Sequence, residues 1–238
     1  MPCGQIRTTE DRCESPERVR ALGPRTLIGD LKHPCLIPTV SLTKGGPQIF
    51  KTDHHPDFRR DHTLLAADVA IATSAAPTFF PIAEIGDGLY ADGGLYANSP
   101  DLIALHEADH FLKADPSEVR LLSIGTTTAK FSFAHGPSLD FGTWQWATGQ
   151  RLVQAMISSQ QQVVDNIVRH KLGDRYVRLD YQQSREQEQA LSLDTANKSA
   201  QRTIKAMADT TIQGAANDLM LGQILSHRSA VPQFFYRS

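Results

Sequence analysis

Residues 72–100 read ATSAAPTFFPIAEIGDGLYADGGLYANSP, and this stretch contains three short motifs in a row. A run of small residues ends at Pro77, Asp92-Gly93-Gly94 follows, and Asn98-Ser99-Pro100 closes the stretch. Taken alone, Asp-Gly is a strong signal for a hairpin turn. A carboxylate on a glycine-framed turn can also be held by backbone at a sheet edge, where a general base could take a proton from a serine hydroxyl.

Taken together, these motifs resemble the patatin family closely. Its members carry Ser-Ala-Ala-Pro-x-x-Phe-Pro, then Asp-Gly-Gly or Asp-Gly-Ala, then Asn-x-Pro opening a helix, and the spacing here agrees. The resemblance implies a serine–aspartate dyad that hydrolyses lipid acyl esters through an acyl-enzyme. Asp92 matches the aspartate that activates the serine, and Gly93 and Gly94 match the rest of its motif. Ser74, Pro77 and Asn98 support the match.

The serine half of such a site is missing from the sequence. The family's nucleophile stands in a Gly-x-Ser-x-Gly elbow between a strand and a helix, and no such elbow occurs in the 238 residues. The glycine-rich oxyanion motif is absent too. Ser74 has Ala72 and Ala76 at the positions of the two elbow glycines, but it lies inside a block that does not hold the family's nucleophile. We therefore expect this chain to be inactive by itself.

This departure sets the expected domain organisation. Residues 1–22 are expected to be a polar N-terminal segment, and residues 23–238 the C-terminal part of a patatin-like domain. Three accounts of the missing serine are open. The sequence begins too late or is a fragment; a separate chain supplies the other half; or the domain is non-catalytic and serves binding or regulation.

The composition limits the classes of partner that the chain is expected to bind. The chain is 40% hydrophobic and 21% charged, with a formal net charge of -2, which is ordinary for a globular protein and favours no nucleic-acid partner. No apolar run is long enough to span a membrane, so a lipid or acyl-ester substrate would be met by peripheral membrane contact. No signal peptide is visible and the three cysteines suggest no disulfide framework, which favours a cytoplasmic location. No cofactor is expected, and the oligomeric state is open.

Hydrophobic periodicity predicts an α/β fold, with helices layered over a central mixed or parallel sheet. The first two strands should form a hairpin, and residues 86–94 a loop. A helix should start with Ser99 as its N-cap and run to about Lys113. The predicted strands are 35–42, 48–52, 119–125 and 175–181, and the other predicted helices are 64–72, 143–170, 198–208 and 210–224.

A rival hypothesis comes from residues 106–110, which match His-Glu-x-x-His on a predicted helix. In zincins, His106 and His110 would bind zinc and Glu107 would act as general base. Catalytic zinc needs a third protein ligand, and the nearest downstream candidate, Glu118, falls beyond the helix end. The helical wheel also places His106, Glu107 and His110 on the solvated face of this helix. Residues 53–62 hold further acids and histidines, but their irregular spacing favours a polar surface loop, so no metal site is expected.

Overall fold

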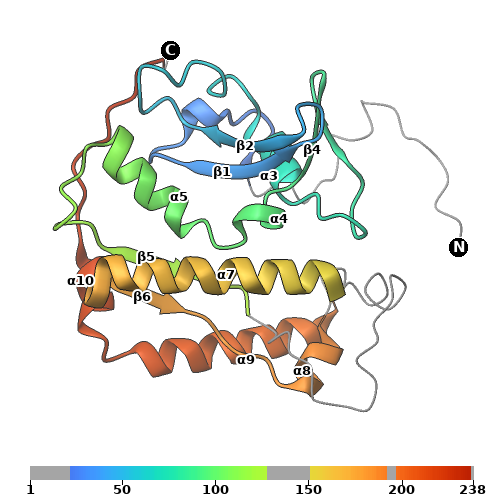
Figure 1. Cartoon of the computed structure of the whole chain (residues 1–238), viewed down its shortest axis with the longest axis vertical. Coiled ribbons are helices and arrows are strands. Elements are labelled where there is room, and N and C mark those ends of the chain that lie inside the picture. Colours follow the sequence, from blue (N-terminus) through green and yellow to red (C-terminus); the bar gives the residue numbers. More distant parts are fainter. Residues whose placement is uncertain (1–21, 128–150, 192–196, 237–238) are drawn as a thin grey trace, which may run out of the picture. The chain divides into compact units, whose positions relative to one another are not determined.

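The computed structural model describes residues 22–127, 151–191 and 197–236 (Figure 1). The chain divides into two compact units. Unit 1 comprises residues 1–93 and 230–238, and unit 2 comprises residues 94–229. Residues 1–21 of the expected N-terminal segment and residues 143–150 of the expected long helix lie outside the described residues.

Unit 1 is built on a four-stranded antiparallel sheet in the order β2-β1-β4-β3. The predicted hairpin is confirmed, because β1 pairs with β2 along its whole length and Gly45 adopts the positive φ of 67° that their turn requires. The helix α3 packs against β1, β3 and β4. The core centres on Phe50, Val69 and Ala72. The elements are η1 Ile28–Asp30, β1 Leu36–Ser41, β2 Gly46–Lys51, α3 Ala66–Thr73, β3 Ala83–Ile85 and β4 Gly88–Asp92.

The loop predicted at residues 86–94 is wrong. Gly86, with φ at 55°, turns the chain between β3 and β4, and β4 then runs to Asp92 in register with β1. A hairpin at Asp92 is wrong too, because the chain continues as the short helix α4 Gly94–Ala97. The ladder to β1 outweighs the local preference of Asp-Gly for a turn, so Asp92 ends a strand and precedes a helical turn.

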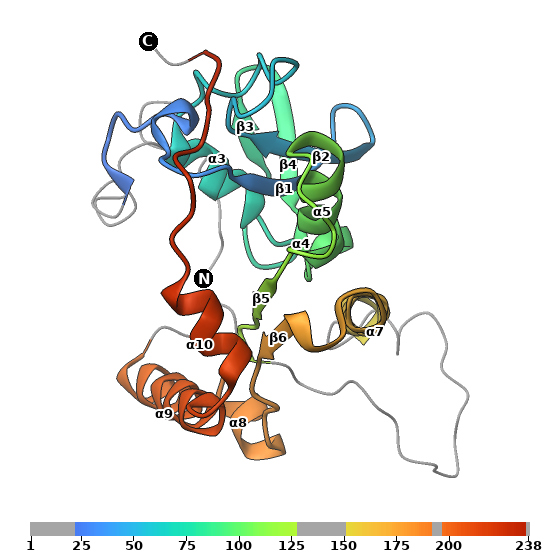
Figure 2. The same cartoon turned by 90° about the vertical axis from the view of Figure 1, so that its left-hand side faces the viewer.

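Unit 2 contains a two-stranded parallel sheet, β5 Leu121–Ile124 beside β6 Tyr176–Leu179. Figure 2 shows α7 on one side of these strands and α9 and α10 on the other. The expected α/β class with layered helices is therefore confirmed, although the described strands form two sheets. The helices are α4 Gly94–Ala97, α5 Asp101–His106, η2 Glu107–Phe111, α7 Arg151–Leu172, η4 Gly173–Arg175, α8 Arg185–Ala190, α9 Lys198–Ala215 and α10 Leu219–Ser226.

Caps explain where several helix boundaries differ from prediction. The break between the last two helices lies later than expected, because the Asp218 carboxylate accepts the Leu221 amide at 2.9 Å and starts α10 there. The helix α8 was not predicted; Ser184 and Gln187 form a capping box at its start. Ser99 is not the cap of α5. Its hydroxyl instead donates to the Asp101 carboxylate at 3.2 Å.

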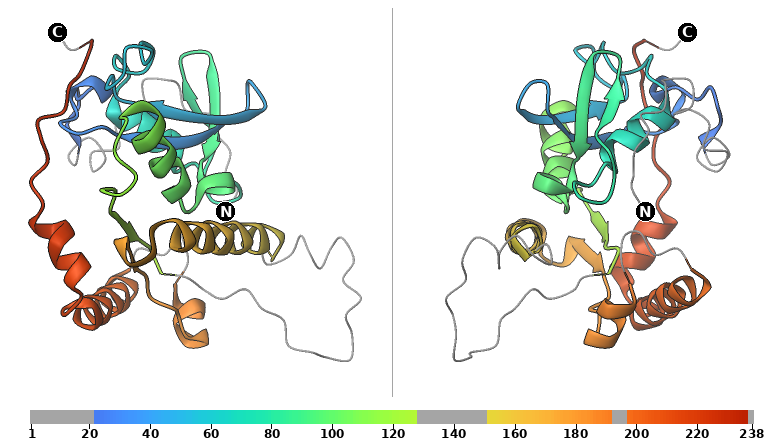
Figure 3. Two further views of the ribbon diagram at one scale, coloured as in Figure 1. Left: turned by 60° about the vertical axis from the view of Figure 1, so that its left-hand side comes forward. Right: turned by 90° about the vertical axis from the view of Figure 1, so that its right-hand side faces the viewer.

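The C-terminal tail belongs to unit 1, where it contacts the segment after β2. The amides of Phe235 and Tyr236 donate to the Asp53 carbonyl (2.9 Å) and carboxylate (2.6 Å). The Tyr236 ring stacks on His62 with centroids 5.7 Å apart. Figure 3 shows the tail in red as an extended segment. Asp53 is fully buried and His54 nearly so, which makes the expectation of a polar surface loop wrong for this part of residues 53–62.

A buried polar network holds unit 2 together. The Asp101 carboxylate accepts hydrogen bonds from Ser99 and from Ser123 (3.0 Å), and it lies 2.9 Å from the Tyr176 hydroxyl. Arg178 donates to Ser123 at 2.8 Å and to Asp180 at 2.7 Å. Burial, reinforced by the Asp101 carboxylate, raises the pKa of Tyr176 far above its usual range. The tyrosine therefore stays a neutral donor.

Replacing Asp101 with alanine should destabilise unit 2 by about 3 kcal/mol, because it leaves buried donors without an acceptor. Urea denaturation followed by circular dichroism measures the change. Asp109→Ala, on an exposed position of the same helical segment, is the matched control and should shift the midpoint little. Equal shifts for the two variants would show that the network contributes no special stability.

Candidate functional site

Asp92 is the last residue of β4, and its backbone is held by two neighbours in unit 1. It pairs with Thr39 of β1 in the antiparallel ladder. Its amide donates to the Ala75 carbonyl at 3.0 Å. This hydrogen bond joins the small-residue run at residues 72–77 to the Asp-Gly-Gly motif, so two motifs that are separated in the sequence by β3 and most of β4 meet at this point. The backbone around Asp92 is therefore fixed from both sides.

Gly93 allows a close approach of two backbone segments. A Cβ atom at this position would lie 2.1 Å from the Pro38 carbonyl oxygen, a distance that no side chain tolerates. The same oxygen accepts a hydrogen bond from the Thr73 hydroxyl at 2.6 Å. The Pro38 carbonyl oxygen is thus in close contact with both Thr73 and Gly93, the residue that follows Asp92. The second residue of the motif is glycine for this steric reason.

The supporting residues Ser74 and Pro77 lie in the same unit. Ser74 caps the C-terminal end of α3, where its hydroxyl donates to the Ala70 carbonyl at 2.7 Å. Its role in the described structure is therefore local. Pro77 is exposed, and the following Thr78 has a φ of 74°, which is unusual for a β-branched residue. Such backbone strain is typical of functional segments.

Gly94 and Asn98 belong to unit 2. Gly94 opens α4, and Asn98 is exposed, with its side-chain amide 3.5 Å from the Gln161 side chain of α7. Both stay predictions as site residues.

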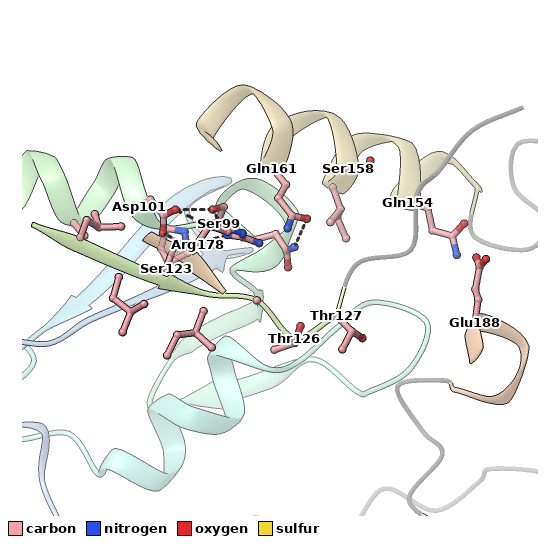
Figure 4. A pocket seen from close by; sticks show the side chains of 18 residues that line it. Ser99, Asp101, Ser123, Thr126, Thr127, Gln154, Ser158, Gln161, Arg178 and Glu188 are labelled. Atoms are coloured by element: carbon pink, nitrogen blue, oxygen red, sulfur yellow. Dashed lines mark hydrogen bonds and ion pairs between the residues drawn. The ribbon is translucent and has the colours of Figure 1, made fainter. Parts of the chain in front are cut away.

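A cavity of about 500 Å³ lies in unit 2 beside β5. Figure 4 shows its polar side chains, with Arg178 directed towards Ser99, Asp101 and Ser123, and with Ser158 and Gln161 projecting from α7. Sequence reasoning missed this group. One available signal was Arg178 within the otherwise apolar strand 176–179, because a charge in a buried strand requires partners.

The His-Glu-x-x-His match is arranged differently from the prediction. His106 and His110 are exposed as expected, and their rings stack with centroids 5.2 Å apart. Glu107 is only 2% exposed, so its placement on the solvated face is wrong. From Glu107 the helix continues as a wider π-helical turn to Phe111, so the constant angle of the helical wheel does not hold beyond this residue. Across the described residues, no three His, Cys, Asp or Glu side chains are grouped to hold a metal ion.

The packing behind Asp92 generates a prediction. Gly93→Ala should destabilise unit 1 by about 2 kcal/mol, because the new methyl group overpacks the contact with Pro38. Thermal unfolding measures the effect. Gly46→Ala is the control, since nothing lies within 4 Å of its added methyl group. A Gly93→Ala protein as stable as Gly46→Ala would contradict the close packing.

Comparison with known proteins places these features in a family. Residues 16–105 match the family described as patatin-like phospholipase. Of the described helices, none combines the length and apolar character needed to cross a membrane.

The chain also resembles three bacterial proteins, each named cGAMP-activated phospholipase. The Pseudomonas aeruginosa protein is 39% identical over 213 residues, which is 89% of this chain and 63% of the relative. The Vibrio cholerae protein is 37% identical over 196 residues (75% and 54%), and the Escherichia coli protein 36% over 202 residues (78% and 56%). The chain thus spans between 54% and 63% of the length of these relatives. By these comparisons, the chain resembles the patatin-like phospholipase family, with the match to the family model at residues 16–105.

Proposed function

We propose that this chain supplies the general base, Asp92, of a lipid acyl hydrolase whose nucleophilic serine lies outside these 238 residues. The observation that carries the proposal is the backbone of Asp92, which is anchored at the end of β4 by Thr39 and Ala75 and backed by the Gly93 contact. A general base must be held within hydrogen-bond reach of its proton. The fixed strand end meets the first condition for such positioning.

In the proposed reaction, the Asp92 carboxylate takes the proton of the serine hydroxyl while the serine oxygen attacks the ester carbonyl of the lipid. The tetrahedral intermediate collapses to an acyl-enzyme, and the released alcohol leaves with that proton. Water, deprotonated by Asp92, then attacks the acyl-enzyme and frees the fatty acid. The proton returns to the serine, so atoms and charge balance over the cycle.

The domain organisation follows from the same proposal. Residues 23–238 would form the part of a patatin-like domain that carries Asp-Gly-Gly, and a further segment would carry the Gly-x-Ser-x-Gly elbow. The greater length of the relatives supports this division. Peripheral contact with a membrane would bring the lipid to the site.

Two alternatives are less well supported. A zinc hydrolase would need a third ligand beside His106 and His110, and the described residues offer no such group. A non-catalytic domain would not need an aspartate at the end of β4, where the backbone is held by Thr39 and Ala75. The experiment below separates this alternative from the hydrolase.

Regulation by a cyclic dinucleotide is a second part of the proposal. It is supported by the relatives, which are named for activation by cGAMP and match 75% to 89% of this chain. The cavity beside β5 is a poor match for the ligand's two phosphates. Its walls carry Asp101 and Glu188 but a single guanidinium, Arg178, which already contacts Asp180. We therefore place the nucleotide elsewhere in the protein.

Asp92 can be tested by joining this chain to the elbow-bearing segment of a patatin-like phospholipase, either as a fusion or by co-expression. The assembled protein should release fatty acid from phospholipid vesicles, whereas the 238-residue chain alone should not. Asp92→Asn should lower kcat by roughly 10³-fold or more, because it removes the base.

Asp87→Asn, in the exposed turn before β4, is the matched control and should leave kcat unchanged. Activity that survives Asp92→Asn would reject Asp92 as the base. A folded assembly without activity would favour the non-catalytic domain.

For regulation, we expect cGAMP to raise the vesicle hydrolysis rate of the same assembly by at least tenfold, as a ligand that binds the active state preferentially would do. AMP and GMP together serve as the control for the uncyclised nucleotides. An unchanged rate at saturating cGAMP, with binding absent by calorimetry, would reject this part of the proposal.

A further inference from the structure

The cavity in unit 2 runs along the edge of β5. It is lined by seven consecutive residues, 121–127. Successive side chains of a strand point to opposite faces of its sheet. A cavity on one face alone would therefore contact alternate residues. This cavity contacts all four residues of β5, Leu121–Ile124, so it reaches the edge of the strand as well as one of its faces.

Backbone hydrogen bonds show which edge this is. The Gly125 amide donates to the Leu179 carbonyl of β6 at 2.8 Å. Because amides alternate in direction along a strand, those of Ser123 and Gly125 face β6, and those of Leu122 and Ile124 face away from it. Among the described residues, no strand pairs with this outer edge. The Ile124 side chain is 71% exposed.

Two helices bound the space beside this edge. The helix α7 contributes Gln154, Ile157, Ser158 and Gln161, which lie on one helical face at spacings of three and four. The start of α5, with Asp101 and Ala104, forms the other wall. Figure 4 shows β5 passing below α7 with the side chains of Ser158 and Gln161 between them.

A pair of parallel strands with an open edge is an incomplete structure. Parallel sheets are almost always larger and covered on both faces, and an unpaired edge is a template for another strand. The cavity has space beside β5, where a neighbouring strand would lie about 4.8 Å away. The features of this site therefore favour an extended polypeptide as its occupant.

We propose that this cavity is a docking slot for a strand that pairs with the outer edge of β5, and that the strand belongs to the segment carrying the nucleophilic serine. The inference rests on the proposed function for the identity of the segment. More than a third of each relative's length has no counterpart in this chain, which leaves ample polypeptide for such a strand. In the Gly-x-Ser-x-Gly elbow the serine follows a strand, and this strand is the one proposed to dock at β5.

The test uses the 238-residue chain and a fluorescent synthetic peptide containing the strand and Gly-x-Ser-x-Gly elbow of a patatin-like phospholipase. Fluorescence anisotropy should show saturable binding, which a scrambled peptide lacks. Bound peptide should slow hydrogen exchange at the Leu122 and Ile124 amides, because these would become donors to the new strand. Exchange at Ser123 and Gly125 should change much less, since their amides face β6.

Ile124→Pro removes one outward amide without removing a donor to β6, and an edge position tolerates proline. It should weaken peptide binding roughly tenfold, whereas Ile124→Val should bind like the wild type. Ser158→Trp fills the slot from α7 and should have a similar effect. Gln213→Trp, on the exposed face of α9, is its matched control.

The slot is rejected if the peptide fails to bind the folded chain, or if both Ile124→Pro and Ser158→Trp bind it as tightly as the wild type. Protection of the outward amides by self-association, seen as a dimer in size-exclusion chromatography without peptide, would reject it in favour of a second copy. The two proposals can fail separately. Asp92-dependent hydrolysis that is unaffected by these variants would reject the slot alone, and a bound peptide in an inactive assembly would reject the hydrolase alone.

Discussion

The carbonyl oxygen of Pro38 is the contact on which the arrangement around Asp92 depends. Pro38 has no amide hydrogen, and the pairing of β1 with β4 stops at the next residue, Thr39. The β4 chain leaves the ladder there and passes so close that only glycine fits at position 93. The Thr73 hydroxyl holds the same oxygen from α3. This one carbonyl oxygen of β1 therefore contacts both α3, through Thr73, and the Asp-Gly-Gly motif, through Gly93.

This arrangement explains why the motifs at residues 72–77 and 92–94 occur together. The small residues at the end of α3 let the chain lie against β4, where Ala75 accepts the Asp92 amide. Ala72 and Ala75 are buried, so larger side chains would separate the two segments. In this chain, the two motifs thus meet at a single packing contact.

Local patterns predicted much of the fold. The β1–β2 hairpin, α3 and both strands of unit 2 were visible from periodicity and turn residues, because each is specified by neighbours in the chain. The end of β4 was not, since its ladder to β1 is a long-range contact that overrides the Asp-Gly turn preference. The π-helical turn that begins at Glu107 was not predicted either, because a helical wheel drawn at a constant angle cannot show a change in the number of residues per turn.

The candidate site was predictable only in part. Asp92 and its glycines came from the family resemblance, and the reason for Gly93 appeared only with the position of Pro38. The partners of Arg178 lie 55 and 79 residues away at Ser123 and Ser99, a separation that no local pattern encodes. A polar network between residues so far apart in the sequence becomes visible only in the three-dimensional structure.

The contacts of Tyr236 with Asp53 join residues 183 positions apart and make unit 1 from two distant parts of the chain. During synthesis, the sheet of unit 1 would leave the ribosome long before the tail that covers Asp53. Unit 2 lies between these two parts in the sequence, so it could fold before unit 1 is complete. Closing so long a loop makes this contact a late step of folding, because the loss of chain entropy precedes the gain from the contact. Completion of unit 1 would therefore wait until all of unit 2 and the tail up to Tyr236 have been synthesised.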